Sequence, residues 1–271
     1  MSICRKSEGN NSMSTLNIFQ ISFEIWGCLI GIVVCLILGA STFRNRDVTG
    51  RKLWRMVLVN NIMLICDALA YLYRGDTTMI GTFMTRISNY SMYLMEYVLL
   101  FCFIGYTDCL TNRKDMHKSH WKEYAFLLNC IAMLGLLATP FTGLYFTFDT
   151  LNRYRRGPGI WISFAVSGIV FGICIWRLFT CRKQLTKTQK HVFLSCMITF
   201  VLCMLLQYVF YGLSLINIAL TVCILLMYFM HCRQQYEYIH TLHIEQAIHD
   251  TAELVRWRIE NQEACYDPDK E

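Results

Sequence analysis

The chain has 271 residues, of which 55% are hydrophobic and 16% are charged, and its formal net charge is +6. Soluble domains carry about 25% charged residues, so this composition, with a mean hydropathy of +0.37, predicts an integral membrane protein. The positive charge lies mostly in short gaps between apolar runs, which excludes a nucleic-acid-binding surface.

Seven apolar segments follow a polar N-terminal tail, residues 1–20, that we expect to be disordered and extracellular. A bilayer-spanning helix needs about 20 mostly apolar residues. The last two segments are separated only around Gly212 and Ser214, but together they are too long for one crossing. The sequence therefore predicts an all-α membrane protein, a seven-transmembrane-helix bundle over residues 21–230. The expected spans are 21–43, 54–73, 83–106, 124–145, 159–179, 192–211 and 213–230.

The basic residues between these spans predict the orientation of the chain. One set of loops holds 12 lysine and arginine residues, whereas the N-terminus and the loops on the opposite side hold six. Seven lysines lie in the first set, and only Lys6 lies on the other side. Because lysine-rich and arginine-rich loops stay in the cytoplasm, we expect a cell-membrane protein with its N-terminus outside and its C-terminus in the cytoplasm.

Arginines gather in the gap between the fourth and fifth spans, within the stretch "FTFDTLNRYRRGPG". This loop is expected outside, where the charge rule does not favour arginine. Arginine forks pair with carboxylates and phosphates. Three interpretations stay open: a belt at the lipid headgroups, recognition of an anionic cue, or a structural pair with Asp67 or Asp149. The candidate cue-binding residues are Asp67, Arg74, Arg86, Arg153, Tyr154, Arg155 and Arg156.

Three acids fall inside the expected spans: Glu24, Asp67 and Glu96. Charges at membrane depth usually mark a function or a specific packing contact. Glu24 is close enough to the outer interface for its side chain to reach it. Asp67 and Glu96 must face the bundle interior or water, and they either form interhelical hydrogen bonds or line a cavity that opens to the outside.

The sequence holds no recognisable catalytic motif. No expected span contains a lysine, no histidine lies in the middle of a span, and neither H-E-x-x-H nor a P-loop occurs. We therefore expect no enzymatic activity, no catalytic residues, no cofactor and no metal.

The chain leaves the last span without a helix breaker, because neither Gly nor Pro occurs from His231 to Asp267. One long cytoplasmic helix is therefore expected over residues 231–265, followed by a short tail, 266–271. A heptad frame places Ile244, Ile248 and Val255 at core positions, which favours a marginal coiled coil between two copies. The alternative is an amphipathic surface helix without a partner.

These features resemble a known family. The motif Tyr154-Arg155-Arg156-Gly157-Pro158, an outside N-terminus, seven spans and a continuous exit helix resemble the N-terminal seven-transmembrane sensor region of bacterial histidine kinases and diguanylate cyclases. The resemblance implies that the exit helix feeds a cytoplasmic kinase or cyclase domain. No such domain follows Glu271, so we expect a fragment, an output domain in a partner, or an orphan receptor.

The resulting hypothesis is a non-enzymatic, multi-pass sensor module of a bacterial two-component or related signalling system. It would relay an external or membrane cue through the seventh span, with Ile244, Ile248 and Val255 in transmission. Expected partners are the lipid bilayer, a second copy of the chain and a kinase or cyclase output domain. The alternative is a small transporter or channel that uses Asp67 and Glu96.

Overall fold

A computed structural model describes residues 15–44, 47–111, 120–183, 185–209 and 214–265. These residues form seven helices and one small hairpin. Two compact units are present, residues 1–227 and 228–271, and each is described by itself. The elements are α1 (Thr15–Arg44), α2 (Val48–Leu72), α3 (Met79–Thr111), α4 (Trp121–Thr142), β1 (Phe146–Phe148), β2 (Tyr154–Arg156), α5 (Ile160–Thr180), α6 (Lys187–Val209) and α7 (Leu215–Cys265).

The helical fold class is confirmed, and within the described residues six helices are long and apolar enough to cross a membrane: α1, α2, α3, α4, α5 and α7. The remaining expected span lies in α6, a helix of 23 residues. Its side chains at 204 and 207–209, and the break around Gly212, lie outside the described residues. The seventh span therefore stays a prediction.

Apolar side chains face outward from the helices of the first unit and polar ones face inward. Leu36, Phe141 and Trp176 are 69%, 91% and 75% exposed, whereas Asp67 and Asn129 are buried. Water would not tolerate so large an apolar surface on a monomer, but lipid does, and polar groups inside lipid must find partners within the protein. This distribution is what a bundle surrounded by lipid requires.

Several helix boundaries differ from those of the expected spans. Helix α1 begins at Thr15, so residues 15–20 are helical, while residues 1–14 lie outside the described residues. Helix α4 ends at Thr142 because Gly143 adopts a left-handed conformation, φ 65°, and its N–H donates to the carbonyl of Thr139 at 2.8 Å. Glycine allows this turn without a steric penalty. Tyr145 consequently leaves the helix instead of extending it.

An aromatic core joins α3, α4 and α5 to the start of the hairpin. Tyr97 of α3 shares a 2.5 Å hydrogen bond with the hydroxyl of Ser163 in α5, and its carbonyl accepts from the amide of Asn129 in α4 at 2.9 Å. The Tyr145 hydroxyl donates to the carbonyl of Ala132 at 3.0 Å. The buried members of this core are Tyr93, Tyr97, Ala132, Leu136, Tyr145, Phe146 and Ile160.

The expected exit helix is present as the second part of α7, which is a single helix of 51 residues. In the second unit, Ile244, Ile248 and Val255 are 48%, 64% and 52% exposed. Residues 266–271 lie outside the described part of the chain.

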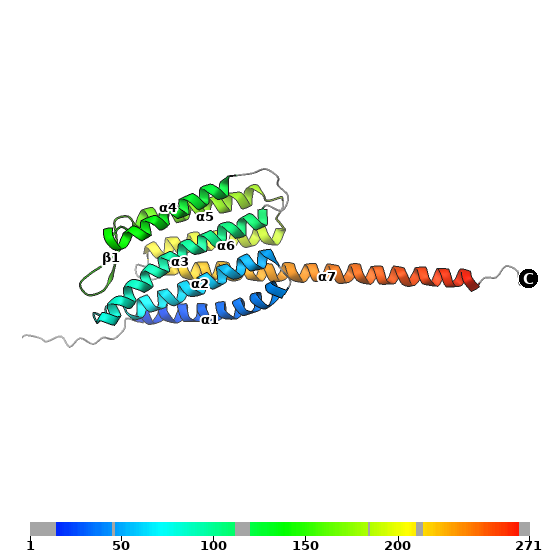
Figure 1. The fold of residues 1–271 in the computed structure, drawn as a ribbon, viewed down its shortest axis with the longest axis horizontal. Coiled ribbons are helices and arrows are strands. Elements are labelled where there is room, and N and C mark those ends of the chain that lie inside the picture. The colour runs from blue at the N-terminus through cyan, green and yellow to red at the C-terminus, as the bar shows by residue number, and fades with distance from the viewer. Residues whose placement is uncertain (1–14, 45–46, 112–119, 184, 210–213, 266–271) are drawn as a thin grey trace, which may run out of the picture. The chain divides into compact units, whose positions relative to one another are not determined.

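The arrangement of the first unit permits a test of orientation. The hairpin lies at the end of the bundle where α1 begins (Figure 1), and α5 runs from the hairpin toward the opposite end. Thr78 and Leu151 belong to the hairpin end, Thr186 belongs to the α5–α6 connection, and all three are exposed.

If the N-terminus is outside, single cysteines at Thr78 and Leu151 in a cysteine-free background should react with an impermeant maleimide in intact cells. A cysteine at Thr186 should react only after the cells are permeabilised. Labelling of a cysteine at Thr186 in intact cells would contradict the predicted orientation. Several basic residues behind this prediction, including Lys6 and those in loop 112–119, lie outside the described residues.

Candidate functional site

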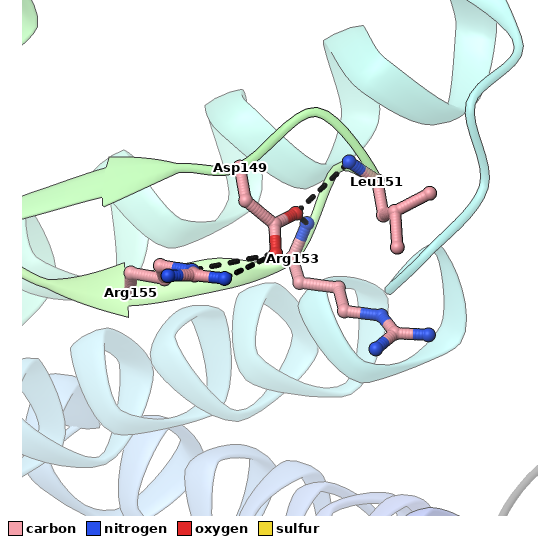
Figure 2. A network of polar contacts seen from close by, with 4 residues as sticks. All are labelled: Asp149, Leu151, Arg153 and Arg155. Atoms are coloured by element: carbon pink, nitrogen blue, oxygen red, sulfur yellow. Dashed lines mark hydrogen bonds and ion pairs between the residues drawn. The ribbon is translucent and has the colours of Figure 1, made fainter.

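The arginine loop forms a two-stranded antiparallel hairpin, a structure the sequence did not predict. The turn is organised by the carboxylate of Asp149, which accepts from the backbone N–H of Leu151 at 3.0 Å and of Arg153 at 2.9 Å. The Arg155 side chain adds contacts from Nε at 3.4 Å and Nη2 at 3.3 Å (Figure 2). The Arg153 N–H bond is the main reason that the pKa of Asp149 lies below its ordinary value. Arg155 therefore forms a pair with Asp149, which is one of the three interpretations of the arginine loop.

Asn152 at the tip of the hairpin anchors it to the turn between α2 and α3. The Asn152 backbone has a φ of 51°, a left-handed conformation that asparagine tolerates better than most residues. Its side-chain amide donates to the carbonyl of Asp76 at 2.7 Å and to the hydroxyl of Thr85 at 3.0 Å. Its own carbonyl accepts from the N–H of Gly75 at 3.3 Å. The hairpin therefore has a defined position on α2 and α3.

Aromatic contacts hold the hairpin strands against α3. The hydroxyls of Tyr154 and Tyr93 are hydrogen-bonded at 2.6 Å, and the rings of Phe146 and Tyr93 stack with centroids 5.3 Å apart. The guanidinium of Arg86 lies 5.9 Å from the ring centroid of Phe148, a cation–π contact. Arg86 therefore supports the hairpin.

A cavity of about 150 Å³ lies beneath the hairpin, between α2, α3, α5 and the start of α7. It collects five of the residues that the sequence singled out: Asp67, Arg74, Glu96, Tyr154 and Arg156. The other predicted cue-binding residues, Arg86, Arg153 and Arg155, are not among its lining residues.

Two acids from different helices lie close together beside this cavity. This acid pair consists of Glu24 in α1 and Asp67 in α2, whose carboxyl groups interact electrostatically. Gln20 donates to Glu24 Oε1 at 2.5 Å, and Asn217 donates to Asp67 Oδ2 at 2.6 Å. Glu24 is 1% exposed, so its side chain is enclosed by the protein.

The acid pair belongs to a polar network that extends along α7. The N–H of Ser214 donates to Gln20 Oε1 at 3.4 Å. Thr221 Oγ1 donates to the carbonyl of Asn217 at 2.9 Å and accepts from the amide of Asn60 in α2 at 3.1 Å. The network therefore connects α1, α2 and the first turns of α7.

The sequence analysis did not identify Gln20, Ser214 and Thr221 as members of a site. The polar residues Ser214, Asn217 and Thr221 are nevertheless spaced at intervals of three and four. That interval places side chains on one face of a helix.

Comparisons with protein-family models, curated proteins and solved structures found no match for this chain. Within the described residues, no group of three or more His, Cys, Asp and Glu side chains is arranged to hold a metal ion.

The hydrogen bond from Asn217 predicts which substitutions at Asp67 the protein tolerates. In Asp67→Asn the side-chain oxygen can still accept from Asn217, so the protein should retain its stability. Asp67→Leu leaves the buried amide of Asn217 without this acceptor, and an unsatisfied buried group costs about 1–3 kcal/mol. Thermal unfolding of the purified protein in detergent micelles should show a lower midpoint for Asp67→Leu only.

The matched control is Glu123→Leu, because the side chain of Glu123 is 75% exposed. This change should alter the free energy of unfolding by less than about 0.5 kcal/mol. Equal midpoints for Asp67→Asn and Asp67→Leu would contradict the contribution of the hydrogen bond from Asn217.

Proposed function

We propose that this chain is a multi-pass membrane sensor module, in which a cue at the cavity changes the packing of α7. One observation carries the proposal. Asn217 of α7 is hydrogen-bonded to Asp67 of α2, both residues line the cavity, and α7 continues as one helix from Leu215 to Cys265. A ligand that changes this contact acts directly on the helix that leaves the bundle.

Helix continuity explains how a local change would be relayed. A backbone hydrogen-bonded at every turn moves largely as a unit, and small helix shifts are an established form of switching. The bond between Asn217 and Asp67 lies where few alternative partners exist, so its loss favours a different, discrete position of α7 rather than a continuous drift. The proposed cue is therefore read as a population shift between two positions of one helix.

The resemblance to the N-terminal sensor region of bacterial histidine kinases and diguanylate cyclases supports the same proposal. The expected location is the cell membrane, with the N-terminus outside and α7 reaching the cytoplasm. The proposed partners are a kinase or cyclase output domain and a second copy of the chain, which would pair through the exposed face of α7.

The alternative is a small transporter or channel, because Asp67 and Glu96 line the same cavity. Such a protein should carry a labelled cation or proton flux when reconstituted into lipid vesicles. The sensor proposal expects no flux above that of empty vesicles. Asp67 already accepts a hydrogen bond from Asn217, which favours a structural contact over a relay.

A chimera tests the coupling between cavity and helix. The chain would be fused through α7 to a histidine kinase of known output, and Asn217→Leu should shift the basal output per molecule by at least about fivefold, the scale of a typical coupling energy. Asn129→Leu is the matched control, because Asn129 makes a buried bond to Tyr97 without involving α7. Equal outputs from both variants would contradict transmission through α7.

The two neighbouring arginines should differ in the same chimera. Arg156 lines the cavity, and an ammonium cannot reproduce the planar guanidinium fork, so Arg156→Lys should alter the output. Arg155 pairs with Asp149 at the surface, its side chain being 70% exposed, and such pairs contribute little. Arg155→Lys should therefore behave like the unsubstituted chain. Unchanged output in both lysine variants would favour a belt at the lipid headgroups, where only the positive charge matters.

Pairing of the second unit can be tested by cross-linking. Ile248→Glu places a charge on the expected seam without a partner and should abolish disulfide or chemical cross-linking of residues 231–265. Gln246→Glu adds the same charge at a position outside the seam and should leave cross-linking unchanged. Cross-linking that survives in Ile248→Glu would contradict this seam, and a lack of cross-linking in the unsubstituted chain would favour a solitary surface helix.

A further inference from the structure

Glu96 is the second acid that lines the cavity, beside Asp67. Within the described residues, no lysine, arginine or histidine forms an ion pair with Glu96, and Ser167 of α5 is its polar neighbour, whereas Asp67 accepts a hydrogen bond from Asn217. A carboxylate at membrane depth is stable only when a cation or a proton neutralises it. The wall of the cavity at Glu96 is therefore suited to an ammonium group.

The opposite charge lines the same cavity. Arg74, which follows α2, and Arg156, at the end of β2, are exposed residues that also line it. Tyr93 lies one turn before Glu96 on α3 and also lines the cavity. Both signs of charge therefore line one small cavity, which is what a small zwitterion requires.

An apolar compartment adjoins the charged one. A second cavity of about 70 Å³ is lined almost entirely by apolar side chains, including Leu99, Phe103 and Phe171. It shares Glu96, Phe164 and Ile216 with the first cavity. A ligand held at Glu96 can therefore place an apolar group among these side chains, where its burial is favourable.

We propose that the cavity binds a free α-amino acid with an apolar side chain: its carboxylate at Arg74 and Arg156, its ammonium at Glu96, and its side chain in the apolar compartment. The assignment rests on the proposed sensor function and names the chemical class of its cue. Ile216, in the first turn of α7, lines both compartments, so a bound side chain would contact the helix that leaves the bundle.

Binding of L-leucine to the purified full chain in lipid nanodiscs tests the assignment. The analogues are 4-methylpentanoate, which lacks the ammonium group, and isoamylamine, which lacks the carboxylate. Isothermal titration should show leucine binding at least about tenfold more tightly than either analogue, because each analogue leaves one charged protein group unpaired. No leucine binding, or equal binding of leucine and 4-methylpentanoate, would overturn the proposal.

Three variants assign the charges to their partners. Glu96→Gln should weaken the binding of leucine about tenfold or more and leave the binding of 4-methylpentanoate unchanged. Arg74→Gln should weaken the binding of leucine and of 4-methylpentanoate and leave the binding of isoamylamine unchanged. Arg155→Gln is the matched control, because Arg155 pairs with Asp149 outside the cavity. Unchanged leucine binding in Glu96→Gln would overturn the ammonium contact. If this variant unfolds in a thermal scan, Glu96→Leu, which also removes the carboxylate, replaces it, with the same expected selectivity.

The chimera separates failure of the ligand from failure of the function. Leucine that binds without changing the kinase output leaves the amino-acid site standing and contradicts the sensor. An output that responds to Asn217→Leu in a protein that binds no leucine overturns the amino-acid assignment and leaves the coupling through α7 intact.

Discussion

The buried carboxyl groups of Glu24 and Asp67 impose the main constraint on this bundle. Two acids enclosed by the protein are tolerable only when they receive hydrogen-bond donors, and those donors come from Gln20 and Asn217. Three segments distant in sequence must therefore meet at one place. The packing of α1, α2 and the first turns of α7 follows from the need to satisfy these groups.

The same requirement for hydrogen-bond partners shapes the hairpin that covers the cavity. Asp149 satisfies two backbone N–H groups of the turn, and Asn152 attaches the tip to the turn between α2 and α3. With the tip held, the second strand directs Tyr154 toward Tyr93 and places Arg156 at the cavity. The arginine-rich composition of the loop thus divides into one structural residue, Arg155, and one cavity residue, Arg156.

The continuity of α7 is what would allow a change at the cavity to reach residues 231–265. The helix begins beside the acid pair and includes the apolar face with Ile244, Ile248 and Val255. The cavity is lined by both signs of charge and adjoins an apolar compartment, so it can select a ligand by its charged and apolar groups. Helix α7 can pass a shift at the cavity on to residues 231–265. The proposed sensor combines these two properties, and the proposed amino-acid ligand is the small molecule whose groups match the compartments.

The sequence by itself determined the local features of this protein: helices long and apolar enough to cross a membrane, an unbroken exit helix, and the unusual character of Asp67, Glu96 and the outer arginines. These follow from composition and residue spacing, which act over a few turns of one helix. Only the tertiary structure decided that Glu24 lies near Asp67, that Asn217 meets Asp67 across 150 residues, and that Arg155 and Arg156 have different surroundings. Such contacts depend on how whole helices pack, because a buried polar group takes whichever partner the fold brings near it, and no local pattern in the chain encodes that choice.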